Sequence, residues 1–188
     1  MTGTIESTWH MFQIRRALLT SKFLAFSFHH INATVRFPEI QTATASLLYI
    51  NLLSILDAAM ATQMTAEEYE RCGNVRNRIM FLRARGKLLD ESGLIAIKDR
   101  RNEIGHEAGK DATVDELAAA VEKVDEQLLA WGLIQRRPPY EVCYGRSGMR
   151  KSSDPNVVFE IEHFIRVLCG EQLVFEAKQT TLHGRVGK

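Results

Sequence analysis

Hydrophobic residues recur three and four positions apart through the first 135 residues, which is the spacing of one face of a helix. This pattern predicts five helices, over residues 7–32, 37–64, 65–89, 94–107 and 113–132. Thr65 and the Thr113–Glu116 segment have the composition of helix N-caps. The positions expected to face the core of the second and fifth helices are Leu47, Leu48, Leu52, Ile55, Leu56, Leu117, Val121, Val124 and Leu128.

The pattern changes at Pro138 and Pro139, because proline interrupts a helix and forces the residue before it into extended backbone. Beyond this pair, apolar residues alternate with polar ones, which is the period of a half-buried strand. We therefore expect a small antiparallel meander over residues 138–183, with a polar loop at 145–155.

These elements predict a mainly α protein. A bundle of about five helices over residues 5–135 is followed by a β appendage over residues 138–183. The length of 188 residues fits one domain with a small addition. Hydrophobic residues make up 45% and charged residues 25% of the chain, an ordinary balance for a globular protein.

Charge and cysteine content narrow the classes of function. The net charge of +1 means that nucleic-acid binding would have to come from a local basic patch. Three widely spaced cysteines without a Cys-x-x-Cys pair argue against a thiolate zinc site, so we expect no metal and no cofactor. The longest apolar stretch contains Asn51 and Asp57, and no signal-peptide pattern precedes it. We expect a cytoplasmic protein without membrane association.

The residues most typical of chemistry lie in one run, Arg101-Asn102-Glu103-Ile104-Gly105-His106, near the end of the fourth helix. Histidine titrates near neutral pH and can serve as a general acid or base. Arginine stays charged and can grip phosphate oxygens with two parallel hydrogen bonds. Asn102 could orient His106 or bind a ribose. Together these residue types could serve the cleavage of a phosphodiester.

With this motif, followed by a well-capped helix, the segment over residues 5–135 resembles the HEPN family of prokaryotic toxins and phage-defence proteins. That family has an Arg-x4–6-His motif in which Asn, Asp or His usually follows the arginine. The resemblance implies a helical bundle, a homodimer in which two motifs meet, and metal-independent RNA cleavage. It also implies catalytic roles for Arg101, Asn102 and His106.

One feature departs from the family pattern. Toxins of this kind that work with a nucleotidyltransferase antitoxin carry a tyrosine two positions after the histidine, and this chain has Ala108 there. The departure puts that partner in doubt but leaves the ribonuclease hypothesis, with another antitoxin or defence-system partner protein, in place.

Helix geometry limits which residues of the motif can lie on the same face. Positions five apart lie about 140° apart around a helix, so Arg101 and His106 do not share a face, whereas Asn102 and His106 do. We expect Gly105 to loosen the last turn. One motif supplies one histidine, so separate acid and base histidines require a second copy of the chain. The alternative is that Arg101 and His106 only cap carbonyls or pair with nearby acids, namely Asp99, Glu103 and Glu107.

A basic segment precedes the motif and contains four candidate RNA-binding arginines, with pairs seven residues apart on one helix side. The alternative is a solvated face that pairs with acids of the fifth helix, namely Asp115, Glu116, Glu122, Asp125 and Glu126. The four arginines are Arg76, Arg78, Arg83 and Arg85.

Two acids are candidate supporting residues, Asp57 and Glu103. Asp57 lies in the most apolar helix, where a carboxylate is costly unless it has a partner. Asp57 either pairs with an arginine, with Arg101 as the candidate, or faces solvent at the edge of the bundle. The second interpretation is slightly favoured.

The leading hypothesis is therefore a metal-independent endoribonuclease that acts on RNA as a homodimer. Two alternatives stay open: a non-catalytic module that binds RNA or a protein and dimerises, and an accessory domain that senses a nucleotide.

Overall fold

The structure is a computed structural model that describes residues 2–20, 33–107, 109–151 and 157–184. The chain separates into two compact units, Met1–Arg136 and Arg137–Lys188. The division falls beside the proline pair. The expected end of the first helix, at residues 21–32, and Ala108 lie outside the described residues.

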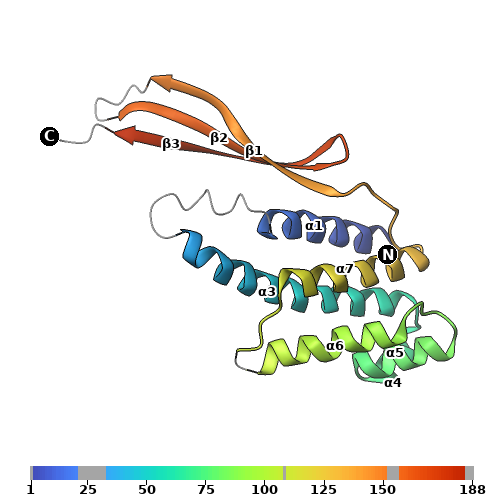
Figure 1. The fold of residues 1–188 in the computed structure, drawn as a ribbon. Coiled ribbons are helices and arrows are strands. Elements are labelled where there is room, and N and C mark those ends of the chain that lie inside the picture. Colours follow the sequence, from blue (N-terminus) through green and yellow to red (C-terminus); the bar gives the residue numbers. More distant parts are fainter. Residues whose placement is uncertain (1, 21–32, 108, 152–156, 185–188) are drawn as a thin grey trace. The chain divides into compact units, whose positions relative to one another are not determined.

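The described part of the first unit consists of six helices (Figure 1). Helix α3 is the central element, since it contacts α1, α5, α6 and α7. The prediction of a mainly α fold is confirmed, whereas the count of five was one helix short. The helices are α1 (Thr2–Thr20), α3 (Ala33–Thr62), α4 (Ala66–Cys72), α5 (Val75–Ala84), α6 (Glu91–His106) and α7 (Val114–Ala130).

The core of the bundle confirms the hydrophobic pattern, because eight of the nine positions expected to face inward are buried. Leu52 and Leu56 of α3 and Leu128 of α7 are completely buried. Leu47 is the exception: it is 68% exposed, so the apolar face of α3 is narrower than expected. On α1, Trp9 and Phe12 belong to the same core.

The predicted helix over residues 65–89 is wrong as a single element, since it divides into α4 and α5. Gly73 ends α4 with φ of 70°, a left-handed conformation that glycine adopts without steric cost. Asn74 then begins α5 by accepting a hydrogen bond from the backbone N–H of Asn77. The expected cap at Thr65 is confirmed as a capping box with Glu68.

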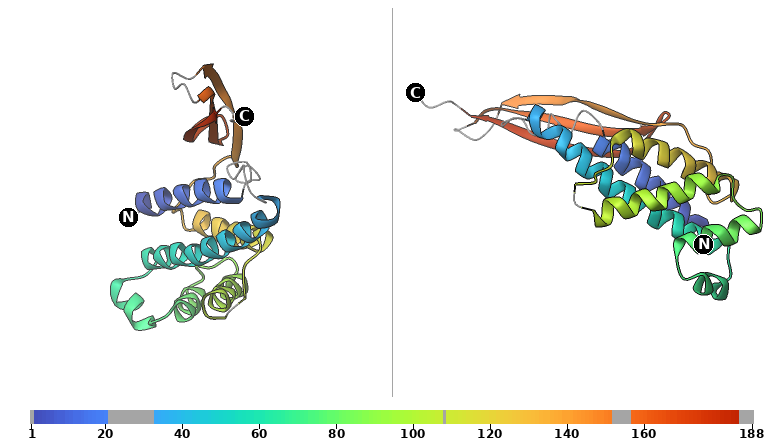
Figure 2. Two further views of the ribbon diagram at one scale, coloured as in Figure 1. Left: turned by 90° about the vertical axis from the view of Figure 1, so that its left-hand side faces the viewer. Right: turned by 60° about the horizontal axis from the view of Figure 1, so that its bottom comes forward.

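The described part of the second unit is an antiparallel sheet in the order β1-β2-β3, with β1 at Tyr140–Lys151, β2 at Val157–Cys169 and β3 at Gln172–Gly184. Figure 2 shows these strands from two further sides, and its right-hand view shows them lengthwise. The polar loop expected at 145–155 is wrong in part, because β1 continues to Lys151; residues 152–156 lie outside the description.

One described helix is long and apolar enough to cross a membrane by length and composition, over Glu39–Thr62 of α3. In the most apolar part of this stretch 56% is buried within the structure, and a core helix of a bundle has the same character.

Candidate functional site

Helix α6 carries the motif and is fixed at its start. Asp90 is its N-cap and accepts a 2.9 Å hydrogen bond from the backbone N–H of Gly93. A Cβ at position 93 would collide with the Asp90 carboxylate, so glycine is needed there. Lys123 of α7 pairs with the same carboxylate. These bonds lower the pKa of Asp90 to about 2, with Lys123 as the largest cause.

The helix continues unbroken through Gly105 and ends at His106. The loosening expected at Gly105 does not occur. Glu107 then turns to extended backbone, and its N–H still donates to the carbonyl of Glu103. Asn102 and His106 are thus one regular helical turn apart and on the same side of α6.

Arg101 occupies a core-facing position on α6. Leu94 and Ile97 are buried, and Ile104 packs against the same core. These three positions and Arg101 are spaced three, four and three residues apart, which is the repeat of one helix face. A half-buried arginine therefore lies where the pattern calls for an apolar side chain.

The guanidinium of Arg101 has one polar contact among the described residues. Its Nη1 lies 3.4 Å from the amide oxygen of Asn102, a long hydrogen bond. The same group extends over Gly105, where a Cβ would come within 3.7 Å of Nη1. No described carboxylate pairs with Arg101. A charged group that is partly desolvated and lacks a counter-ion is costly, unless a ligand supplies the missing charge.

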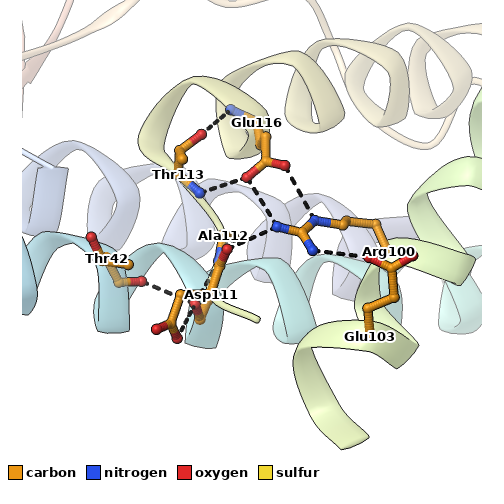
Figure 3. A network of polar contacts seen from close by, with 8 residues as sticks. Thr42, Arg100, Glu103, Asp111, Ala112, Thr113 and Glu116 are labelled. Carbon is orange, nitrogen blue, oxygen red and sulfur yellow. Dashed lines mark hydrogen bonds and ion pairs between the residues drawn. The ribbon is translucent and has the colours of Figure 1, made fainter. Parts of the chain in front are cut away.

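Arg100, one residue earlier, has the opposite surroundings (Figure 3). Its guanidinium pairs with Glu103 at 2.9 Å and with Glu116 of α7 at 3.2 Å, and donates to the backbone carbonyl of Asp111 at 2.8 Å. These hydrogen bonds, first that to Glu103 and then that to Glu116, raise the pKa of Arg100. Glu116 also accepts a 2.7 Å hydrogen bond from the backbone of Thr113. Arg100 thus ties the end of α6 to the start of α7.

The segment before α7 is anchored on α3 as well. Ser46 accepts a 2.8 Å hydrogen bond from the backbone N–H of Ala112 and donates to the Asp111 carboxylate at 3.1 Å. Tyr49, one turn further along α3, has its pKa raised to about 12, mainly by burial and next by the nearby Glu116. Its hydroxyl therefore stays protonated in this polar cluster.

Sequence reasoning missed this cluster. The three-residue spacing of Arg100 and Glu103 was a signal for one of its ion pairs. Glu103, a candidate supporting residue of the motif, does not pair with Arg101 or His106 among the described residues; its carboxylate bonds Arg100.

His106 is exposed and makes no hydrogen bond or ion pair with any described residue. The capping and pairing roles considered for it, with Glu103 or Glu107, are not found in the described part of the chain. The imidazole is thus accessible to a ligand or to another protein chain.

Asp57 pairs with an arginine, as one of the two alternatives expected, but the partner is Arg78 rather than Arg101. Asp57 does not reach Arg101; it accepts hydrogen bonds from Arg78 at 2.8 Å and from the hydroxyl of Tyr69 at 2.8 Å. The guanidinium of Arg78 also stacks on the Tyr69 ring, 3.5 Å from its centre. Burial, followed by the hydrogen bond to Asp57, raises the pKa of Tyr69. Only 11% of the Arg78 side chain is exposed, so Arg78 joins α3, α4 and α5 rather than facing RNA.

The other three arginines of the basic segment differ in their partners. Arg83 pairs with Glu91 at 2.9 Å, and Arg85 pairs with Glu68 at 2.6 Å. Arg76 is exposed and forms no ion pair with a described residue. The acids of the fifth helix, which we considered as partners, form no hydrogen bond or ion pair with any of the four among the described residues. Arg76 instead lies near Asp99, whose pKa is lowered by Lys98 first and by Arg76 to a smaller extent.

A cavity of about 750 Å³ lies apart from the motif. It is lined by residues of α1, α3 and α4 and by the segment after α7, including Ile5, Ala61, Tyr69 and Trp131. The described residues include no cluster of three or more His, Cys, Asp or Glu side chains that could hold a metal ion.

The chain has no match among models of protein families, curated proteins or solved structures. The residues and their geometry must therefore support any functional assignment.

Proposed function

We propose that this protein is an endoribonuclease in which Arg101, Asn102 and His106 form the catalytic site. The observation that carries the proposal is the contrast within the motif. Arg101 is half-buried and has no counter-ion in the described chain, while the exposed His106 lies one turn beyond Asn102. A phosphate would supply the negatively charged partner that the Arg101 guanidinium lacks.

The reaction would be a transesterification. A neutral imidazole removes the proton of a ribose 2′-hydroxyl, and the resulting oxygen attacks the adjacent phosphorus. The bond to the 5′-oxygen breaks, and that oxygen takes a proton from an imidazolium. The products are a 2′,3′-cyclic phosphate and a free 5′-hydroxyl. Arg101 would stabilise the negative charge that develops on the non-bridging oxygens.

Asn102 has a separate role in this proposal. Its amide oxygen faces the Arg101 guanidinium, and its position is one turn before His106. The amide would orient the guanidinium and donate a hydrogen bond to the ribose or to a phosphate oxygen.

A second copy of the chain would complete the site. His106 is the one histidine of the motif, and a separate acid and base need two imidazoles. Two copies that meet at the exposed ends of α6 would provide them. The resemblance of the motif to that of the HEPN family supports this homodimer. It also supports a role as a toxin or phage-defence effector that cleaves RNA without a metal.

Purified protein should cleave total RNA in the presence of a chelator, and the double variant Arg101→Ala/His106→Ala should be inactive. Cleavage by the double variant at the wild-type rate would rule out this site. RNA binding or dimerisation by a wild-type protein that does not cleave would favour the non-catalytic module instead. Stabilisation by a nucleotide alone would favour a sensor.

A further inference from the structure

We infer that single-stranded RNA lies along the side of α6 that carries Asp99, Asn102 and His106, with Arg76 of α5 binding a phosphate beyond the cleavage site. This inference rests on the proposed function, because it extends the path of the RNA away from His106. Of the four arginines of the basic segment, Arg76 would then contact RNA, and the other three would not.

The pairing of α5 with α6 sets the position of Arg76. The Arg83–Glu91 ion pair joins the end of α5 to the start of α6. Helices α5 and α6 follow each other in the chain and pack against each other. Arg76 lies seven residues before Arg83 on α5, and Asp99 lies eight residues after Glu91 on α6. The two helices therefore run antiparallel, and Arg76 lies level with the second half of α6, where the motif is located.

Asp99, Asn102 and His106 form one stripe along α6, since they are separated by three and four residues. The axial distance from Asp99 to His106 is about 10 Å. A stacked strand advances about 3.4 Å per nucleotide, so an arginine level with Asp99 would meet a phosphate about three nucleotides from the one at His106. Arg76 thus lies at the far end of a short track that begins at the proposed catalytic residues.

The partners of the other arginines exclude them from this track. Arg78 is bonded to Asp57 and nearly buried, and Arg85 is bonded to Glu68 and lies over the Phe81 ring. Arg83 is exposed but pairs with Glu91 at the opposite end of the helix pair. Among the four, Arg76 is the arginine whose guanidinium has no described carboxylate within 4 Å.

The negative charge of Asp99 should weaken RNA binding at Arg76. Its carboxylate is partly neutralised by Lys98 at 2.8 Å and also attracts Arg76. An RNA phosphate would compete with Asp99 for Arg76 and would be repelled by it. Removal of the Asp99 charge should therefore strengthen RNA binding, whereas removal of the Arg76 charge should weaken it.

The test measures the affinity of a fluorescent single-stranded RNA over a range of salt concentrations, in a His106→Ala background that blocks cleavage. Arg76→Ala should weaken binding several-fold and reduce the slope of log K against log salt by about 0.7, the value for one lost phosphate contact on a single strand. Asp99→Asn should strengthen binding. Arg83→Ala is the matched control on the same helix and should change neither quantity.

Equal losses for Arg76→Ala and Arg83→Ala would overturn the track, and so would unchanged affinity for Arg76→Ala. Cleavage by the wild-type protein is measured separately. Normal cleavage with no effect of Arg76→Ala on affinity refutes the track and leaves the proposed function intact. An effect of Arg76→Ala on affinity without wild-type cleavage refutes the proposed function and supports Arg76 as an RNA contact.

Discussion

Arg100 and Arg101 are adjacent on α6 but have opposite electrostatic surroundings. Arg100 is bonded to two carboxylates and a backbone carbonyl, whereas Arg101 meets only the Asn102 amide oxygen among the described residues. The first arrangement stabilises the end of the helix. The surroundings of Arg101 leave a cation without a counter-ion at a core-facing position. This arrangement lowers the stability of the fold, and a functional role for Arg101 would explain it.

This contrast predicts opposite effects of the same substitution. Arg101→Met should raise the free energy of unfolding by about 1 kcal/mol, because an apolar side chain suits the core-facing stripe of α6. The same variant should lose RNA cleavage. Arg100→Met should lower stability, because it removes the ion pairs that Glu103 and Glu116 form with Arg100. Urea unfolding of both variants checks this, and a destabilised Arg101→Met would contradict the account.

The pair of Asp57 and Arg78 predicts a structural role for an arginine that the sequence placed on an RNA-binding surface. Arg78→Ala should destabilise the bundle by about 3 kcal/mol, since it leaves a partly buried carboxylate without its cation. Arg83→Ala removes an exposed ion pair and should cost less than about 1 kcal/mol. Thermal unfolding of both variants measures the difference, and equal stabilities would refute the assignment of Arg78 to the core.

The local elements could be predicted from sequence because they depend on short-range spacing. The caps at Thr65 and Thr113 and the core positions of α3 and α7 follow from such patterns. The break at Gly73 was not recognised, because the basic residues on either side of it continue a helical pattern. The extension of β1 past Gly145 was missed for the opposite reason: polar residues there resemble a loop, but they pair with β2.

The candidate site could be predicted from the sequence only in part. The motif itself is local, and its placement at the end of α6 could be foreseen. The partners of each charged side chain could not, because Asp57 and Arg78 are 21 residues apart and Arg100 and Glu116 are 16 apart. Tertiary packing selects these pairs. Only the structure therefore distinguishes Arg101 from Arg100 and Arg76 from its neighbours.

The low pKa of Asp90, about 2, predicts how acid affects the fold. The unfolded chain has a pKa near 3.8 at this carboxyl, so the native state favours the charged form. Its contribution to stability is complete above about pH 4 and is lost as the pH falls toward 2. Asp90→Asn should be less stable than wild type at pH 7, and the difference should shrink over this window.

Urea titrations at several pH values between 2 and 7 measure this change. Glu122→Gln, at an exposed acid of α7 with no described ion pair, is the control. An Asp90→Asn variant whose deficit stays constant between pH 4 and pH 2 would contradict the linkage.

A site completed by two copies predicts interference between chains. When wild-type protein is denatured and refolded with a threefold excess of His106→Ala chains, random pairing leaves one wild-type chain in four with a wild-type partner. The activity of a fixed amount of wild-type chain should therefore fall about fourfold. A threefold excess of bovine albumin controls for added protein. Undiminished activity in the mixture would show that each copy works alone.

The most direct measurement of the central claim is the single-turnover rate of RNA cleavage in the presence of a chelator. Wild-type protein, His106→Ala and His163→Ala should be compared, since His163 lies in the sheet and hydrogen-bonds Tyr144 at 2.7 Å. We expect His106→Ala to be slower by a factor of about 100 or more, as loss of a general acid or base requires, with its thermal stability unchanged. His163→Ala should cleave at the wild-type rate. A wild-type protein that does not cleave RNA, or a His106→Ala variant as fast as wild type, would contradict the assignment of catalysis to this motif.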